Sequence, residues 1–369
     1  MTDVKILTPL LPVEMDFDDY AQSFARGTAP DRCPYGLENL PEGWELKPPS
    51  AVTRNRLIDV VRRAVRRLSD ADLVGALMRW RDIRDADVIY AHFEADYLGA
   101  AFLLRLMRQR RPIVIGHTIW LFAVWDRLPA WKRRLLRSTM RRVDLFVYNA
   151  EPNCGFGSTI VPEGRHEYVP FGVSNIFSAT PPWSPRDGKP LVLCVGNDRS
   201  RDWDVLADAL ASLPLDVDIR LATSQSPRRI DSAIVRPTGD FAELCELYRT
   251  ASCLVLASMP NMHAGGITTM LEGAAVGVPI VATDAGGLRA YFGDSEVAYV
   301  PPRDPLALRS AIVQQLRNPV EAQRMAQRAR SRVRESGYSN AMYWERIAAC
   351  LDENGLLEES RRFALGKRG

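Results

Sequence analysis

Residues 263–287 have the sequence HAGGITTMLEGAAVGVPIVATDAGG, and this stretch decides the fold. Its pattern predicts a helix over 268–277, and the apolar run 278–283 predicts a buried strand that ends in a glycine turn. Gly265 and Gly266 let a ligand approach the first amides of the helix, and these amides together with the helix dipole favour phosphate. The alternative is that the two glycines serve only as the entry to the helix.

The same alternation of short apolar runs with helical patterns occurs in two series along the chain. Apolar runs without polar alternation are typical of parallel strands covered on both faces. We expect strands over 4–8, 88–92, 113–117, 143–149, 191–196, 217–222, 252–258 and 278–283. We expect helices over 56–68, 72–82, 96–109, 129–141, 203–212, 240–250, 268–277 and 304–317. Two such series predict two doubly wound, Rossmann-like α/β domains whose strand ends face each other across a cleft.

A proline-rich stretch separates the two series. Residues 178–190, SATPPWSPRDGKP, hold four prolines and show no periodicity. Proline fixes φ and removes a hydrogen-bond donor, so the stretch suits a semi-rigid linker. We therefore expect an N-terminal domain over 1–180 and a C-terminal domain over 186–338, followed by one more helix at about 340–354.

Composition and charge exclude several classes of protein. With 369 residues, 46% of them hydrophobic and 25% charged, the chain is long enough for two globular domains. The net charge of +3 does not indicate a nucleic-acid binder. Six scattered cysteines without a CxxC pair, only four histidines and an N-terminus without a signal-peptide pattern predict a cytoplasmic protein with free thiols and no metal site. The longest apolar run, 113–125, is shorter than the roughly 20 residues that span a membrane.

Two further features belong to the C-terminal series. Arg199 and Arg201 follow the strand 191–196 and precede a helix, where guanidinium groups offer fork-shaped donors to the oxygens of a diphosphate. Glu272 lies about one turn inside the helix 268–277, where it can accept hydrogen bonds from sugar hydroxyls. The alternatives are ordinary surface arginines and a solvated glutamate.

In the N-terminal series, two histidines stand at strand ends. His92 ends the run VIYAH and His117 ends the run IVIGH, so both are expected at the same edge of a parallel sheet. A lone histidine is more often a structural residue, but two of only four at equivalent positions favour a function for His117. Acidic residues are also expected near this edge, and they are Glu14, Asp16, Asp18, Asp19 and Glu94.

Basic residues cluster in two segments. Residues 101–142 hold eleven Arg or Lys and one acid, and residues 54–68 hold six arginines and one aspartate. Amphipathic basic helices can lie on anionic lipid, whereas a run of charge is more often a solvated face. The sequence leaves peripheral contact with the inner face of a membrane open.

These features together carry a resemblance to the GT-B glycosyltransferases, closest to glycosyltransferase family four. The matching segments are DVIYAHFEADYLGAAFLLRLMRQRRPIVIGHTIW (87–120), YVPFGVSNIF (168–177), ELYRTASCLVLAS (246–258) and ITTMLEGAAVGVPIVATDAGGL (267–288). The resemblance implies transfer of a sugar from a nucleoside-diphosphate sugar to an acceptor hydroxyl, with retention of configuration, in glycan, glycolipid or natural-product biosynthesis. It implies no cofactor and no metal at the diphosphate. It also implies that the end of the chain, about 340–369, packs back on the N-terminal domain.

The resemblance assigns roles residue by residue. Glu272 matches the glutamate that holds the nucleotide ribose, and His117 matches the histidine beside the donor sugar. Arg201 matches the family's diphosphate lysine, while Asn197 occupies the usual arginine position, so that Arg199 is expected to compensate. The loop and helix start that meet the donor phosphate or sugar comprise Gly265, Gly266, Ile267 and Thr268.

The sequence departs from the family at the first acid of its Glu-x7-Glu motif. That position is Ala264, or His263 after a shift of one residue, and no acid lies between 259 and 271. The contact to a donor sugar hydroxyl is therefore missing or supplied by Asn261 or His263. We expect a donor whose sugar is deoxygenated or substituted at that contact, because a site without the acid loses its preference for the hydroxyl.

Two alternatives to a retaining transferase stay open. An inverting transferase would use an acid such as Asp16, Asp18 or Glu94 as a general base. A degenerate binding protein would keep the nucleotide pocket and lack turnover. In each case the expected partner is a nucleotide sugar and no nucleic acid. For the two transferases the acceptor is an unknown hydroxyl compound, with Asp16, Asp18, His92 and Glu94 on the acceptor side.

Overall fold

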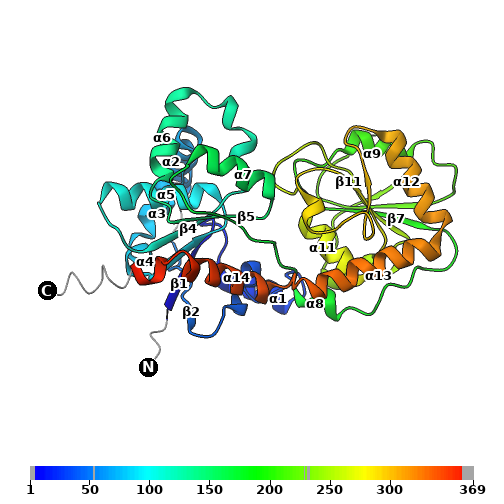
Figure 1. Ribbon diagram of the computed structural model, residues 1–369, viewed down its shortest axis with the longest axis horizontal. Coiled ribbons are helices and arrows are strands. Elements are labelled where there is room, and N and C mark those ends of the chain that lie inside the picture. Colours follow the sequence, from blue (N-terminus) through cyan, green and yellow to red (C-terminus); the bar gives the residue numbers. More distant parts are fainter. Residues whose placement is uncertain (1–4, 53–54, 228, 231–232, 360–369) are drawn as a thin grey trace. The chain divides into compact units, whose positions relative to one another are not determined.

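The computed structural model describes residues 5–52, 55–227, 229–230 and 233–359, which form two compact units (Figure 1). The N-terminal unit contains the chain up to Tyr20, Leu37–Val169 and the chain from Tyr343 onward. The C-terminal unit contains Ala21–Gly36 and Pro170–Met342. The described residues of each unit form one parallel sheet of six strands covered by helices, so the predicted α/β class with two Rossmann-like sheets is confirmed.

The sheet of the N-terminal unit has the strand order β2-β1-β3-β4-β5-β6. Its strands are β1 (Lys5–Leu10), β2 (Trp44–Leu46), β3 (Val88–Ala91), β4 (Ile113–His117), β5 (Leu145–Tyr148) and β6 (His166–Tyr168). The central strands β3, β4 and β5 are buried along their whole length, as parallel strands covered on both faces must be.

The helices of this unit follow the strands in the order of a doubly wound fold. They are α2 (Arg56–Ser69), α3 (Leu73–Met78), α4 (Trp80–Asp85), α5 (Glu94–Leu106), α6 (Ala130–Met140), α7 (Glu151–Ile160) and α14 (Asn340–Glu353). Helix α1 (Phe17–Ala25) begins in this unit and continues into the other. Short 3₁₀ turns lie at Pro34–Asn39, Leu121–Ala123 and Trp125–Arg127.

The sheet of the C-terminal unit has the order β12-β11-β10-β7-β8-β9. Its strands are β7 (Leu191–Val195), β8 (Asp218–Ala222), β9 (Ala233–Val235), β10 (Cys253–Leu256), β11 (Ile280–Thr283) and β12 (Ala298–Val300). The chain runs from β7 to β8 on one side and returns to β10 on the other side of β7. The switch point where the strand order reverses therefore lies between β7 and β10.

The helices of the C-terminal unit include one that is buried almost all round. They are α8 (Asn175–Ala179), α9 (Trp203–Leu210), α10 (Phe241–Thr250), α11 (Ile267–Val276), α12 (Pro305–Arg317) and α13 (Pro319–Glu335), with a 3₁₀ turn at Leu288–Ala290. Helix α11 approaches the sheet closely at Gly273, where a Cβ would lie 2.5 Å from the Leu254 side chain. The small residues in the segment EGAAVG (272–277) thus allow α11 to pack closely against the sheet.

All eight predicted strands are present. The differences from the prediction are one helix that is divided in two and several elements that were not predicted. The helix predicted over 72–82 is two helices, α3 and α4, because the backbone leaves helical geometry at Arg79. The sequence pattern did not indicate the edge strands β2, β6, β9 and β12 or the helices α1, α7, α8 and α13. The edge strands have three residues each, mostly half-buried, so they lack the continuous apolar run that marks a central strand.

The proline-rich stretch 178–190 lies within the C-terminal unit, and the chain enters that unit at Pro170. The stretch is anchored to its own unit by hydrogen bonds: the Trp183 amide donates to Val276 O at 3.2 Å and the Trp183 indole donates to Ala251 O at 2.7 Å. Residues 21–36 also pack on this unit, where Ser174 Oγ donates to Pro30 O at 3.0 Å.

The last helix returns to the N-terminal unit. Tyr343 and Trp344 on α14 are buried, and the Tyr343 hydroxyl lies 3.0 Å from the hydroxyl of Tyr90 on β3. The Trp344 ring packs edge-on against Tyr90 with ring centroids 4.8 Å apart. Val4 of the first predicted strand, Arg54 of the basic segment 54–68 and residues 360–369 at the end of the chain lie outside the described residues.

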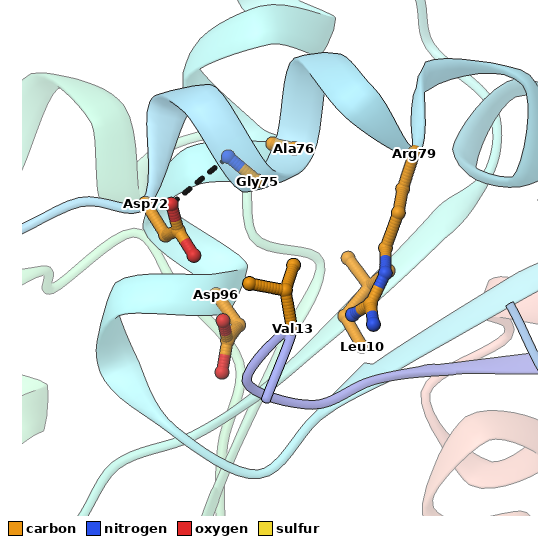
Figure 2. A pocket seen from close by; sticks show the side chains of 7 residues that line it. All are labelled: Leu10, Val13, Asp72, Gly75, Ala76, Arg79 and Asp96. Carbon is orange, nitrogen blue, oxygen red and sulfur yellow. Dashed lines mark hydrogen bonds between the residues drawn. The ribbon is translucent and has the colours of Figure 1, made fainter. Parts of the chain in front are cut away.

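A small cavity in the N-terminal unit is lined by a buried charge cluster, which Figure 2 shows from close by. Asp72 forms an ion pair with the buried Arg62 at 2.6 Å and accepts a hydrogen bond from the Gly75 amide at 2.9 Å. Asp96 is also buried, and its Oδ2 has no hydrogen-bond partner among the described residues. Burial and the neighbouring charge of Asp72 raise the pKa of Asp96 to about 7.

Asp96→Asn should make the protein more stable at pH 8 than the wild type. Because the folded-state pKa of Asp96 lies above its value near 3.9 in the unfolded chain, the stability that this group contributes is present below about pH 4 and is lost as pH rises to about 7. Differential scanning fluorimetry from pH 5 to pH 8 should therefore show a variant-minus-wild-type difference in Tm that grows with pH. Asp126→Asn, at an exposed carboxylate, is the control. A difference for Asp96→Asn that does not change with pH would contradict the account.

Candidate functional site

Two loops meet at the switch point of the C-terminal sheet. The loop after β7 contains Arg201, and the loop after β10 contains Ser258, and these two residues form an isolated antiparallel bridge. The Met259 amide also donates to Ser200 O at 2.7 Å. Ligands of doubly wound sheets bind outside the carboxyl ends of the strands at such a point, so this edge is the candidate site of the unit.

The N-terminus of α11 presents unpaired backbone donors to this edge. Gly266 precedes the helix with φ +96°, a left-handed conformation that suits glycine. The amides of Thr268 and Thr269 have no hydrogen-bond acceptor among the described residues. Open amides and the positive end of the helix dipole make an anion site, as the sequence predicts for Gly265, Gly266, Ile267 and Thr268.

Arg201 points its guanidinium group at the same place. Its Nη2 donates to Val195 O at 2.8 Å and to Thr269 Oγ1 at 3.3 Å, and the side chain is 6% exposed. Its Nε and Nη1 are buried and have no acceptor within the described part of the chain. A Cβ at Gly196 or at Gly266 would lie 2.7 Å from the guanidinium nitrogens, so both glycines leave room for it.

Glu272 lies on the buried face of α11, one turn inside the helix. Its Oε2 accepts a hydrogen bond of 2.7 Å from the hydroxyl of Tyr248, a buried residue on α10. Burial raises the pKa of Glu272 to about 7, although the Tyr248 hydrogen bond and the charge of Arg201 both act to lower it. Nothing in the sequence pattern of the helix 240–250 indicated Tyr248 as a partner of this carboxylate.

The loop between β10 and α11 is held by Asn261. Its Oδ1 accepts hydrogen bonds from the amides of His263 and Gly265, and its Nδ2 donates to Met259 O. Gly286, with φ +67°, lies so close that a Cβ there would be 2.3 Å from Asn261 Oδ1. The Asn261 side chain therefore fixes the shape of this loop.

Asn197 and Arg199 lie on the outer part of the β7 loop, and both are exposed. Asn197 Oδ1 accepts three hydrogen bonds, from Thr223 Oγ1, the Ser224 amide and Ser224 Oγ, at 2.7–2.9 Å. The amide oxygen of Asn197 thus ties this loop to the loop that follows β8.

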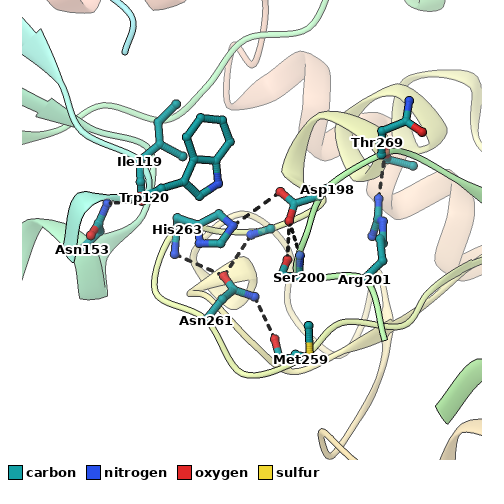
Figure 3. Close-up of polar contacts among 12 residues, drawn as sticks. Ile119, Trp120, Asn153, Asp198, Ser200, Arg201, Met259, Asn261, His263 and Thr269 are labelled. Carbon is teal, nitrogen blue, oxygen red and sulfur yellow. Dashed lines mark hydrogen bonds and ion pairs between the residues drawn. The ribbon is translucent and has the colours of Figure 1, made fainter. Parts of the chain in front are cut away.

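Asp198 belongs to the site as well, although it was not among the predicted site residues. Its Oδ1 accepts hydrogen bonds from the Ser200 amide at 2.7 Å and from Ser200 Oγ at 2.6 Å, and its Oδ2 lies 3.4 Å from His263 Nε2 (Figure 3). Burial acts to raise the pKa of Asp198, but the hydrogen bonds from His263 and Ser200 lower it well below its usual range. An acid placed two residues after a strand-end glycine was the available signal.

In the N-terminal unit, His92 and His117 do meet at the carboxyl edge of the sheet. Their Nδ1 atoms lie 3.2 Å apart, and His92 Nδ1 lies 2.9 Å from the Tyr90 hydroxyl. Burial lowers the pKa of His117 to about 4, and burial together with His117 lowers the pKa of His92 well below its usual value. Both imidazoles are therefore neutral at pH 7.

The acids of the N-terminal unit hold the backbone. Glu94 Oε1 accepts hydrogen bonds from three consecutive amides, those of Ile119, Trp120 and Leu121, at 2.5–2.9 Å. Asp16 Oδ1 accepts from the Asp18 and Asp19 amides at the start of α1. The Asp18 side chain itself is exposed.

A cavity of about 200 Å³ lies beside Asp16 in this unit. It is lined by Val13, Glu14, Met15, Asp16, Phe17, Asp19, Pro49, Ser50, Ala51, Val52 and Arg79. Across the described ranges, no group of three or more His, Cys, Asp or Glu is arranged to hold a metal ion.

Comparison with known proteins gives a family match over the C-terminal unit. Residues 189–318 match the family model described as "Glycosyl transferases group 1". A search of curated proteins finds no match to the chain.

Solved structures match over nearly the whole chain. Sucrose-phosphate synthase from Thermosynechococcus elongatus has a TM-score of 0.67 at 15% identity, with 95% of this chain and 98% of that chain covered. HepE of Anabaena in complex with UDP has a TM-score of 0.62 at 14% identity, covering 95% and 100%. A glycosyltransferase from Rickettsia africae has a TM-score of 0.59 at 13% identity, covering 96% and 98%. At these identities the likeness shows a common fold.

Tyr248→Phe should raise the pKa of Glu272 further. The Tyr248 hydroxyl donates to the ionised carboxylate and stabilises that form, so its removal favours the protonated form. Titration of the Glu272 carboxyl by ¹³C NMR should give a higher midpoint in the variant than in the wild type. Tyr299→Phe is the matched control, because the Tyr299 hydroxyl donates to a backbone carbonyl, Phe292 O. An unchanged Glu272 midpoint in Tyr248→Phe would show that the hydroxyl does not set the ionisation.

Proposed function

We propose that the chain is a glycosyltransferase that moves a sugar from a nucleoside-diphosphate sugar to an acceptor hydroxyl with retention of configuration. The match of residues 189–318 to the glycosyl transferases group 1 model and the fold shared with solved glycosyltransferases support this proposal. One observation carries the proposal. Two unpaired N–H donors of the buried Arg201 and the open amides of α11 converge on the switch point of the C-terminal sheet.

This arrangement suits a diphosphate. Guanidinium and backbone amides bind phosphate oxygens by charge-assisted hydrogen bonds, and burial keeps water from competing for Arg201. The proposal assigns the negative charge of the leaving group to these donors, without a metal ion. HepE, which has a similar fold, has been solved in complex with UDP and with UDP-glucose, and this supports a nucleotide sugar as the donor here.

Glu272 is assigned to the ribose. Its carboxylate lies on the same helix as the anion site, and the ionised form accepts hydrogen bonds from hydroxyl groups. Because burial raises the pKa of Glu272 to about 7, a share of its carboxyl groups is ionised at neutral pH.

The chemistry is stabilisation of the leaving group. The bond between the anomeric carbon and the diphosphate oxygen breaks, the acceptor oxygen bonds to the anomeric carbon, and the acceptor proton passes to the departing diphosphate. Preorganised donors aimed at developing charge are commonly the largest contribution to catalysis. We assign the acceptor to the N-terminal unit, where His92 and His117 are neutral imidazoles at the carboxyl edge of the sheet.

Backbone hydrogen bonds engage two of the three acids that an inverting transferase would use as a base. An inverting transferase needs a carboxylate with free lone pairs as general base. Glu94 Oε1 already accepts three amide hydrogen bonds, and Asp16 Oδ1 accepts two. These contacts engage one oxygen each of Glu94 and Asp16, and the exposed Asp18 keeps the inverting alternative open to analysis of the product.

Kinetics of two variants test the assignment, with a panel of nucleotide sugars and acceptors in buffer that contains EDTA. Arg201→Met should lower kcat by roughly 10²–10³, because charge on the diphosphate grows as the bond breaks. Glu272→Gln should instead raise KM about tenfold with kcat little changed, because a ribose contact is made equally in the ground and transition states. NMR of the product reads its anomeric configuration.

Arg220→Met is the matched control, since Arg220 is similarly buried but donates to the carbonyl groups of Ile234 on β9 and of Arg236 just after β9. It should lower Tm and leave kcat unchanged. An Arg201 variant with wild-type kcat would refute the diphosphate role. Binding of a nucleotide sugar in thermal shift without any transfer would favour the degenerate binding protein, and an inverted product would favour the inverting alternative.

A second feature of the N-terminal unit, on helix α2, concerns contact with a lipid membrane. Helix α2 carries an exposed apolar stripe formed by Leu57, Val60, Val61 and Leu68, with Leu57 73% and Leu68 70% exposed. The spacing of three and four residues puts these side chains on one helix face, and the exposed Arg56, Arg63 and Arg67 flank it. A solvated face does not need exposed leucines, so we propose that α2 lies on an anionic membrane.

Helix α6 extends this surface. Lys132 on α6 pairs with Asp70, the residue that ends α2, at 2.7 Å. The neighbouring Trp131 is 59% exposed, and aromatic side chains of this kind favour the membrane interface. Within the described part of the chain, no helix is long and apolar enough to cross a bilayer.

Co-sedimentation with vesicles tests the membrane surface. The wild type should bind vesicles that contain phosphatidylglycerol and should lose binding as salt is raised, because charge attraction is screened. Leu57→Glu combined with Leu68→Glu should abolish binding at low salt. Leu306→Glu is the control, at an equally exposed leucine on α12. Binding that survives the double substitution would place the lipid contact on another surface, and no binding by the wild type at low salt would favour a solvated or protein-binding face.

A further inference from the structure

The loop before α11 contains no acid between residues 259 and 271, yet a carboxylate lies beside it. Asp198 comes from the other loop of the switch point, after β7, and its Oδ2 is 3.4 Å from His263 Nε2 (Figure 3). The tertiary structure therefore brings to His263 an acid that is distant from it in the sequence.

The Asp198 carboxylate is held in one position. Oδ1 accepts two hydrogen bonds from Ser200, one from its amide and one from its hydroxyl, while the Asp198 side chain stays 20% exposed. Ser200 is in turn fixed against the helix entry, since a Cβ at Gly265 would lie 2.3 Å from Ser200 Oγ. Oδ1 thus serves the loop, and Oδ2 is the oxygen left for a ligand and for His263.

The position of Asp198 relative to the anion site limits what it can bind. The Arg201 amide donates to Asp198 O at 3.2 Å, so the carboxylate and the guanidinium belong to one short loop. A carboxylate repels phosphate oxygens at short range and cannot be a ligand of the diphosphate itself. The part of a nucleotide sugar that adjoins the diphosphate and carries hydrogen-bond donors is the sugar.

We propose that Asp198, oriented by Ser200 and paired with His263, forms the donor-sugar subsite and accepts a hydrogen bond from a sugar hydroxyl. This inference rests on the proposed function. It replaces the expectation of a deoxygenated or substituted sugar with the opposite one, because an ionised acceptor is present. The donor is then a sugar that keeps a free hydroxyl at this contact, and the subsite rejects its deoxy analogue.

Binding measurements separate this subsite from the diphosphate site. Asp198→Asn keeps an oxygen for the two Ser200 hydrogen bonds and replaces Oδ2 by an amide. Isothermal titration with UDP and UDP-glucose, and with GDP and GDP-mannose, first finds the pair that the wild type binds. For that pair, Asp198→Asn should leave the Kd of the nucleoside diphosphate within about twofold and weaken the nucleotide sugar by roughly tenfold or more.

Deoxy analogues of the sugar identify the hydroxyl. In the wild type, removal of the contacted hydroxyl should weaken binding by at least tenfold, and in Asp198→Asn the same removal should cost little, so that the two changes are not additive. Asp204→Asn is the matched control, because it removes an exposed carboxylate from the same region, at the start of α9. It should leave the deoxy penalty as in the wild type.

The outcomes are distinguishable. If the wild type binds no nucleoside diphosphate, the proposed function itself fails. If the diphosphate binds and Asp198→Asn weakens it as much as the nucleotide sugar, Asp198 acts on the loop and the subsite assignment is wrong. A Ser200→Ala variant, which keeps the carboxylate but loses one of its hydrogen bonds, should show a smaller, intermediate deoxy penalty. A deoxy penalty that persists in full in Asp198→Asn overturns the proposal.

Discussion

The buried guanidinium of Arg201 is the group on which the C-terminal site depends. It sits where two glycines, Gly196 and Gly266, leave room for it, and it ties Val195 O at the end of β7 to Thr269 at the start of α11. A buried cation costs free energy unless it is paired, and here two guanidinium nitrogens, Nε and Nη1, lack any acceptor among the described residues. Such unpaired donors make sense in a site that completes its hydrogen bonds with an anionic ligand.

The two carboxylates near this cation, Glu272 and Asp198, have pKa values shifted in opposite directions. Glu272 is buried on α11 with its pKa raised to about 7, whereas Asp198 has its pKa held well below its usual range by Ser200 and His263. One carboxylate comes from helix α11 and the other from the loop after β7. Burial raises the pKa of Glu272, and hydrogen bonding lowers the pKa of Asp198. Different parts of one nucleotide sugar can therefore be recognised by acids of unlike character.

The N-terminal unit uses its polar groups differently. Glu94 gathers three consecutive amides of the turn after β4 onto one oxygen, which fixes that turn without secondary structure. The His92 and His117 rings are buried together and kept neutral. Neutral imidazoles can donate and accept hydrogen bonds at a strand edge without adding charge to it. The exposed apolar stripe of α2 stands apart from this edge chemistry.

The sequence by itself determined the two series of parallel strands, because β-branched apolar runs that are covered on both faces leave a clear pattern. It also predicted a candidate anion site, since glycines before a helix and an arginine after a strand are local features. The sequence did not predict the edge strands of three mostly half-buried residues, nor the packing of residues 178–190 on the C-terminal unit, because neither has a local pattern. Only the tertiary structure decided that Asp198 stands beside His263 and that Tyr248 bonds Glu272. These contacts join residues 65 and 24 positions apart, and it is the reversal of strand order around β7 that brings two separate loops to one edge.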